Sequence, residues 1–215
     1  MIIMPIPLLE RLIKSNSILR EIIEWIKTFA ITFILVLFIF GNIISTTGVK
    51  GPSMEPNFFE GDRVFIYNLG YYFSEPKRGD IVILSKYYSD KGLIINTITV
   101  AKDLINNISN MITKNIEVKY IVKRVIGIPG DTIDIKDGYV YLNGNRLEEN
   151  YVKGQTLERL GLSYPITIPE SKVFVLGDNR EESLDSRDLG LASYDQIKGK
   201  VILRLLPISR FGKID

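Results

Sequence analysis

Residues 28–49 read TFAITFILVLFIFGNIISTTGV, a run of 22 residues without a charged side chain. Within residues 29–40, every residue except Thr32 is apolar. At about 1.5 Å per residue, a helix of this length spans a hydrocarbon core of roughly 30 Å. The stretch therefore predicts a single transmembrane helix over residues 28–49.

The basic residues on either side of this run predict its orientation. Four precede it, namely Arg11, Lys14, Arg20 and Lys27, whereas the first stretch after it carries two, Lys50 and Arg63. Because basic residues are retained on the cytoplasmic side, residues 1–27 are expected in the cytoplasm and residues 50–215 outside. A cleavable signal sequence is disfavoured because 27 residues precede the run and no small-x-small site follows it. A buried core helix is disfavoured because the run has no polar face.

The composition limits the chemistry. The chain has 215 residues, 27 basic and 25 acidic side chains, and neither cysteine nor histidine. Thiolate nucleophiles, disulfides, serine–histidine pairs and metal sites built from thiolates or imidazoles are therefore excluded. With a net charge of +2 and no long basic run, nucleic acid is not an expected partner. Any general base must be lysine, aspartate, glutamate, tyrosine or a chain terminus.

Beyond the apolar run, the pattern predicts a mainly antiparallel β domain. Short β-rich segments are separated by Gly, Pro, Asn and Asp, at residues 63–67, 80–84, 120–126, 132–135, 139–142, 172–176 and 200–205. Asn143-Gly144 after residues 139–142 is typical of a tight hairpin.

Residues 91–112 depart from this pattern. Apolar residues recur at helical spacing, at Ile94, Ile98, Ala101, Ile105 and Ile108. We expect an inserted amphipathic helix. The favoured interpretation is that the helix packs on the sheet, and the alternative is that it lies on the membrane surface.

Three segments carry polar groups suited to catalysis. In residues 51–56, GPSMEP, prolines stiffen the backbone on both sides of Ser53. In residues 120–131, YIVKRVIGIPGD, strand alternation places Lys123 with Ile121 and Val125, and Arg124 on the other face. Burial of a lysine in such a strand lowers its pKa from about 10.4, and a value near 8 requires roughly 3 kcal/mol of desolvation. A neutral lysine would then be a base for a serine.

The third segment, residues 177–187, reads GDNREESLDSR and follows an apolar strand. Its short polar side chains are typical of a hydrogen-bonded loop in which Asp185 pairs with Arg180 or Arg187. The alternatives are an ordinary solvated loop and a calcium loop, although the EF-hand spacing is absent.

Together, and in this order behind an apolar anchor, these segments resemble the bacterial type I signal peptidases, or leader peptidases. The resemblance covers most of the chain from Gly51 onward and includes four boxes, at residues 53–56, 78–82, 123–131 and 177–187, with residues 206–212 similar to the family's C-terminal strand.

The resemblance implies a Ser/Lys dyad protease in which Ser53 is the nucleophile and Lys123 is the general base. It implies that Ser183 orients the lysine amine, and that Asp185, Arg187 and the neighbouring Asp178 support the loop. It implies no cofactor and no metal ion.

Three departures from the family pattern stand out. Gly51 replaces the serine with which some members complete the oxyanion hole, so the backbone N–H of Ser53 is the expected donor. Asn57 stands where threonine is common, and the stretch between Leu84 and Lys123 is longer than expected.

The sequence thus predicts a serine endopeptidase on the outer face of a bacterial cytoplasmic membrane. Its expected substrates are exported preproteins with small-x-small cleavage sites, with phospholipid and the export machinery as neighbours. Two alternatives are a soluble self-cleaving repressor-type protease, which would not need an anchor, and a non-enzymatic anchored β domain, in which Lys123→Ala would leave function intact.

Overall fold

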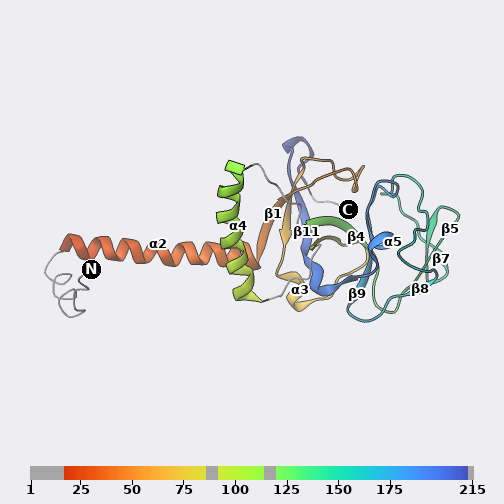
Figure 1. The fold of residues 1–215 in the computed structure, drawn as a ribbon, viewed down its shortest axis with the longest axis horizontal. Coiled ribbons are helices and arrows are strands. Elements are labelled where there is room, and N and C mark those ends of the chain that lie inside the picture. Colours follow the sequence, from red (N-terminus) through yellow and green to blue (C-terminus); the bar gives the residue numbers. More distant parts are fainter. Residues whose placement is uncertain (1–16, 86–91, 114–119, 213–215) are drawn as a thin grey trace.

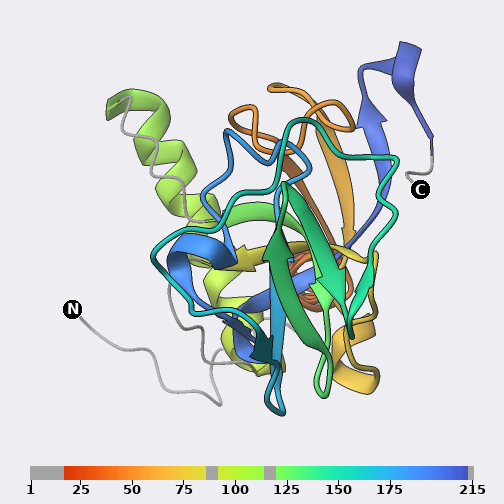
Figure 2. The same ribbon diagram turned by 90° about the vertical axis from the view of Figure 1, so that its right-hand side faces the viewer.

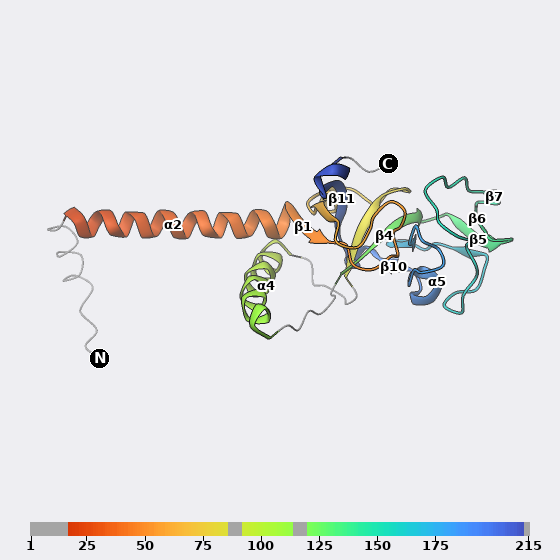
Figure 3. The same ribbon diagram turned by 90° about the horizontal axis from the view of Figure 1, so that it is seen from above.

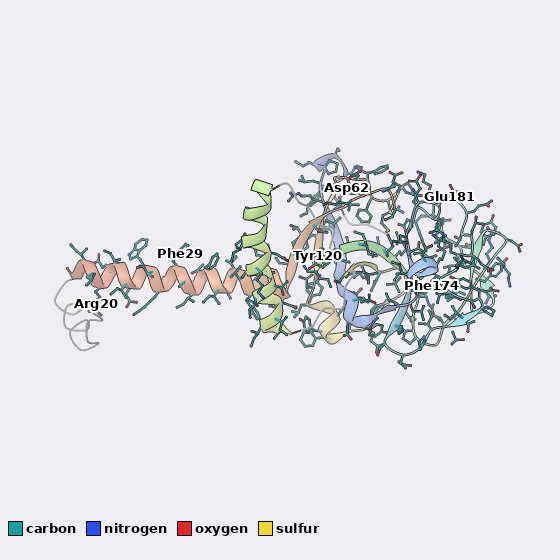
Figure 4. The ribbon with its side chains drawn as sticks, viewed as in Figure 1. Arg20, Phe29, Asp62, Tyr120, Phe174 and Glu181 are labelled. Carbon is teal, nitrogen blue, oxygen red and sulfur yellow. The ribbon has the colours of Figure 1, made fainter. Side chains whose placement is uncertain are left out.

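The computed structural model describes residues 17–85, 92–113 and 120–212. Helix α2, Ser17–Asn42, projects from the β-rich body of the molecule along its longest axis (Figure 1). Phe29 points outward from this helix with no other part of the described chain near it (Figure 4). Within α2 only Gly41 and Asn42 are buried. It is the one helix in the described ranges that is long and apolar enough to cross a membrane.

The bounds of α2 correct the expected span of residues 28–49. The helix begins earlier and ends at Asn42, and Ile44–Gly48 form strand β1, which pairs antiparallel with β2, Arg63–Tyr67. The C-terminal part of α2, residues 28–42, and β1 both lack charged residues, but isoleucine and threonine in β1 favour the extended backbone of a strand. The absence of charged residues therefore does not show where the helix ends and the strand begins.

A seven-stranded antiparallel sheet forms the main layer of the domain. Its order is β1-β2-β11-β3-β4-β9-β10. The remaining members are β3 (Ile81–Ser85), β4 (Tyr120–Gly127), β9 (Lys172–Leu176), β10 (Ala192–Ser193) and β11 (Ile197–Leu206). Strands β3 and β4 lie near the middle of this sheet, which positions β4 to hold buried side chains.

A smaller four-stranded sheet lies at the end of the molecule farthest from α2, facing the viewer in Figure 2. It has the order β7-β6-β5-β8 and is formed by β5 (Thr132–Lys136), β6 (Tyr139–Leu142), β7 (Asn145–Arg146) and β8 (Ile166–Thr167). Asn143 and Gly144 have φ of 53° and 83° and connect β6 to β7. Positive φ at both residues is what the predicted two-residue hairpin turn requires.

An apolar cluster joins the two sheets. It includes Ile126 from β4, Ile133 and Ile135 from β5, and Phe174 and Leu176 from β9, each at most 2% exposed. At roughly 25 cal/mol per Å² of apolar surface removed from water, such a cluster is a main source of the domain's stability. The predicted class, a mainly antiparallel β domain behind an apolar helix, is confirmed.

The helices outside α2 are short, with one exception. Helix α4, Leu93–Thr113, matches the predicted insertion at residues 91–112, although residue 91 and the side chain of Ile108 lie outside the described part. It crosses the end of α2 at a steep angle in two perpendicular views (Figures 1 and 3). The others are α3 (Gly70–Phe73), α5 (Ser186–Leu189), η1 (Tyr194–Gln196) and η2 (Ile208–Arg210).

Candidate active site

Ser53 and Lys123 meet although 70 positions separate them in the chain. Lys123 Nζ lies 2.8 Å from Ser53 Oγ and donates a second hydrogen bond to the Val122 carbonyl at 2.9 Å. The two side chains come from a turn after β1 and from the middle of β4. A hydroxyl and an amine in direct hydrogen-bond contact can exchange a proton.

The turn that carries Ser53 is fixed by its neighbours on both sides. The backbone N–H of Asn179 donates to the Ser53 carbonyl at 3.1 Å, and the Asn179 side chain donates to the Pro52 carbonyl at 3.2 Å. Met54 is 1% exposed and anchors the turn in an apolar cluster. The N–H of Ser53 donates no hydrogen bond within the described ranges, so it is available to an incoming oxygen atom.

Gly51 has a structural reason to be glycine. Its φ is +74°, in the left-handed region that residues with a Cβ rarely adopt. The serine that some members of the resembled family carry at this position would therefore require a different backbone path. The departure fits an oxyanion hole made by backbone groups.

Lys123 lies in the face of β4 that alternation predicted. It sits opposite Val82 of β3, and Val82 packs in one cluster with Ile121 and Val125. Lys123 is 2% exposed. Burial lowers the pKa of Lys123 from 10.5 to about 8, and this effect outweighs the opposing influence of the nearby carboxylates of Asp185 and Asp178.

Arg124, on the other face of β4, is also buried and forms an ion pair with Asp178. Its Nε and Nη2 atoms donate to the two carboxylate oxygens at 2.9 and 2.8 Å. Asn57 donates a further hydrogen bond to the same carboxylate at 2.7 Å, and another to the Tyr151 carbonyl at 2.9 Å. Asn57 thus ties the segment after the serine turn to the loop that follows β9.

That loop is held by a second buried ion pair. Arg187 donates from Nε and Nη2 to Asp185, both at 2.9 Å, and the Gly177 N–H donates to Asp185 at 3.1 Å. Burial would raise the pKa of Asp185, but the hydrogen bonds and charge of Arg187 hold that pKa below its usual range. Of the two arginines considered from sequence, Arg187 is the partner of Asp185, and Arg180 instead pairs with Glu149.

Ser183 is part of the site but does not make the expected contact. Its Oγ is buried and makes no hydrogen bond to Lys123 Nζ, which is held by Ser53 and Val122 instead. The Ser183 hydroxyl lies toward Asp185 and helps to lower the pKa of that carboxyl. Ser183 packs directly against Gly177, where an added Cβ would overlap both Ser183 Oγ and the Ser53 carbonyl. The orienting role expected for Ser183 therefore stays a prediction.

The structure brings together all six residues predicted for the site and adds others. Sequence reasoning gave no role to Asn57, Arg124 or Asn179, which fix the two loops around the dyad. In the sequence, Asn57 stands out only as a departure from a family pattern. The available signal was its place directly after Pro56, where a short amide side chain often makes hydrogen bonds in a turn.

Two hollows lie along β4. A cavity of about 50 Å³ is lined by Ser53 and by residues that include Val49, Ile83 and Ile121. A second, of about 310 Å³, is lined by Ile121, Leu184 and Asp185 among others. Ile121 lines both, so the two hollows are neighbours along β4.

Comparisons with known proteins show which family the chain resembles over most of its length. The family described as "Signal peptidase, peptidase S26" matches residues 22–206. "Signal peptidase I" of Bacillus licheniformis is 33% identical over 210 residues, covering 94% of this chain and 98% of the relative. "Signal peptidase IB" of Staphylococcus aureus (strain COL) is 33% identical over 208 residues, covering 89% and 93%. A solved signal peptidase I from Enterococcus faecalis V583 is 28% identical, covers 59% of this chain and 97% of its own, and superposes with a TM-score of 0.38.

The match to the family extends over most of the chain, and each of these two curated relatives is covered almost completely. This chain belongs to the signal peptidase family, peptidase S26.

Proposed function

We propose that this chain is a membrane-anchored serine endopeptidase that removes signal peptides from exported preproteins by a Ser/Lys dyad. The observation that carries the proposal is the 2.8 Å contact between Lys123 Nζ and Ser53 Oγ. In a chain without histidine, lysine is the residue best suited to activate a serine.

In the proposed mechanism, neutral Lys123 accepts the proton of Ser53 while Oγ attacks the scissile carbonyl. The free N–H of Ser53 then donates to the developing oxyanion, and a donor in this position is worth about 3 kcal/mol. As the C–N bond breaks, the lysine ammonium returns its proton to the leaving amine, and an acyl-enzyme remains. A water molecule, deprotonated by Lys123, attacks this ester and releases Ser53.

The charges around the amine suit this role. Lys123 faces the carboxylates of Asp178 and Asp185, but each is paired with a buried arginine, Arg124 or Arg187. Each ion pair has no net charge, so neither strongly stabilises a lysine ammonium. Desolvation therefore dominates, and the neutral base is accessible at moderately alkaline pH.

The two neighbouring hollows support a preference for small side chains. In an extended substrate, alternate side chains point to the same side. The shared wall at Ile121 lets the side chain at the cleavage site occupy the 50 Å³ cavity while the one two residues earlier enters the larger hollow. The smaller cavity suits alanine or glycine, as small-x-small sites require.

Helix α2 supplies the membrane anchor in this proposal. Its 26 residues make a helix of about 39 Å, longer than a hydrocarbon core of roughly 30 Å. The excess of basic residues before the apolar run supports a cytoplasmic N-terminus and a catalytic domain on the outer face of the cytoplasmic membrane. Confining enzyme and preprotein to one membrane raises their effective concentration.

The test is incubation of the detergent-solubilised protein with a preprotein, with the new N-terminus read by mass spectrometry. Ser53→Ala should abolish cleavage, and Lys123→Arg should do the same because a guanidinium stays protonated. Ser74→Ala, at an exposed hydroxyl directly after α3, is the matched control and should cleave normally. Full activity in Ser53→Ala would refute the proposal.

A further inference from the structure

Helix α4 carries an apolar stripe that the described protein does not cover. Ile94, Ile98 and Ile105 are 75%, 48% and 67% exposed, and Ala101 lies between them. These residues recur at i, i+4, i+7 and i+11, the spacing of one helical face. The favoured sequence interpretation, in which this stripe packs on the sheet, therefore does not describe the structure.

The opposite face of α4 is the one turned toward the domain. Asn96, Thr99 and Val100 line a cavity together with residues of α3 and η1. At 100° per residue, this set is centred about 180° round the helix from the stripe. The stripe therefore faces away from the catalytic domain, toward the side on which α2 extends.

Close packing fixes α4 against the end of α2. A Cβ on Gly41 would lie only 3.1 Å from the backbone of Asn96, so glycine lets the two helices approach closely. Asn42 Nδ2 donates to the Leu93 carbonyl at 3.1 Å and to Thr97 Oγ1 at 3.0 Å. Because α4 crosses α2 steeply in both views, it lies roughly parallel to any bilayer that α2 spans (Figures 1 and 3).

We propose that α4 lies in the outer interface of a phospholipid bilayer, with the stripe of Ile94, Ile98, Ala101 and Ile105 in the acyl boundary. The inference rests on α2 spanning the membrane, as proposed above. A helix has a radius of about 5 Å, and α2 rises about 1.5 Å per residue. The stripe on α4 therefore lies about three residues of α2 closer to the membrane centre than Gly41, at the level of Phe38. Phe38 and Phe40 are exposed at this level of α2, which continues the apolar surface.

The polar residues of α4 fit the same placement. Asn96 and Thr99 lie on the domain side, above the stripe, where headgroups and water remain. Lys102 is exposed beside the stripe, where its long side chain can reach lipid phosphates while its methylenes stay in the apolar layer. With α2 as one contact and α4 as a second, the domain has a fixed orientation above the lipid.

The chain contains no cysteine, so single-cysteine variants can each carry one nitroxide label. The full-length protein is reconstituted in vesicles of phosphatidylethanolamine and phosphatidylglycerol, with labels at Ile94→Cys, Ile98→Cys, Thr99→Cys and Leu35→Cys. Electron paramagnetic resonance spectra are recorded with oxygen, which concentrates in lipid, and then with a water-soluble nickel complex. The reagent that relaxes a label more strongly shows whether that label is in lipid or in water. We expect oxygen to relax the labels at positions 94, 98 and 35 more strongly, and the nickel complex to relax the label at position 99 more strongly.

The outcomes separate the two proposals. If Leu35 is in lipid but Ile94 and Ile98 favour the nickel complex, α4 is in water and the inference is overturned while the anchor stands. If those two labels are shielded from both reagents, a protein partner or a second copy covers the stripe, which also overturns it. If Leu35 itself is in water, the anchor fails and the inference fails with it.

A second readout tests the role in catalysis. The double variant Ile94→Asn/Ile98→Asn should cleave a preprotein embedded in vesicles several-fold more slowly than the unaltered protein. It should cleave a short soluble peptide at an unchanged rate, because both side chains are exposed on the face of α4 turned away from the catalytic domain. Thr99→Asn is the control and should retain both activities. Equal loss with both substrates would indicate a folding defect and contradict a membrane role.

Discussion

The amine of Lys123 should lose its proton near pH 8, and the cleavage rate should follow that loss. Burial lowers its pKa from 10.5 to about 8, which corresponds to about 3.4 kcal/mol between the two protonation states. The neutral fraction is then about 0.1 at pH 7 and about 0.9 at pH 9. Because only neutral lysine can accept the Ser53 proton, kcat/KM should rise about tenfold between these pH values and level off above pH 9.

The assay is kcat/KM for an internally quenched signal-peptide substrate in detergent, measured at half-unit steps from pH 6 to pH 9.5. A lysine with an unshifted pKa would give a different curve, with about a hundredfold rise from pH 7 to pH 9 and no bend. Lys136→Ala, at an exposed lysine in the smaller sheet, should leave the profile unchanged. Either a flat profile or one that climbs without a bend would refute the buried, neutral lysine.

The same geometry predicts three further results. Lys123→Met should stabilise the fold at pH 7 by up to about 3 kcal/mol in thermal or denaturant unfolding. The lysine binds its proton more tightly in the unfolded chain than in the folded protein, so the free energy of unfolding of the unaltered protein rises between pH 8 and pH 10.5. The stability advantage of Lys123→Met over the unaltered protein therefore disappears across that pH range. Asp178→Asn should lower the free energy of unfolding by about 3–5 kcal/mol because Arg124 is left buried without a carboxylate. Gly177→Ala should reduce kcat/KM about a hundredfold because its Cβ would displace Ser183 and the serine turn.

Matched controls distinguish these effects from general damage. Asp134→Asn removes a surface ion pair with Lys136 and should change stability by less than about 1 kcal/mol. Gly92→Ala adds a Cβ whose nearest neighbour is 3.5 Å away, so activity should persist. The description of the site is wrong if Asp178→Asn is as mild as Asp134→Asn, or if Gly177→Ala remains fully active. A Lys123→Met variant no more stable at pH 7 would contradict the burial penalty.

The longer strands of both sheets could be predicted where alternation and turn residues agree. Residues 63–67, 139–142 and 172–176 coincide with β2, β6 and β9. The two-residue strands β7, β8 and β10 are too short to carry a periodic pattern. Strand β1 was missed because it continues the uncharged run of α2, and only its pairing with β2 distinguishes it.

The site was predictable in its members but not in all its contacts. The resemblance to a known family singled out Ser53 and Lys123, and the absence of histidine and cysteine from the chain agrees with a lysine base. The pairing of Arg124 with Asp178 joins residues 54 positions apart, and several carboxylates were equally plausible partners from sequence. Asn57 likewise reaches across the fold to Asp178, which no local pattern indicates.

The connection between α2 and the sheet is short and rigid. Ile43 alone separates the helix from β1, and its carbonyl accepts a hydrogen bond from the Asn68 N–H at 2.9 Å. With α2 in the bilayer, the five residues of β1 form a stiff spacer of about 17 Å below the serine turn. Such a spacer holds Ser53 at a fixed height above the membrane surface. The choice of scissile bond would then depend on its distance from the membrane as well as on the side chains beside it.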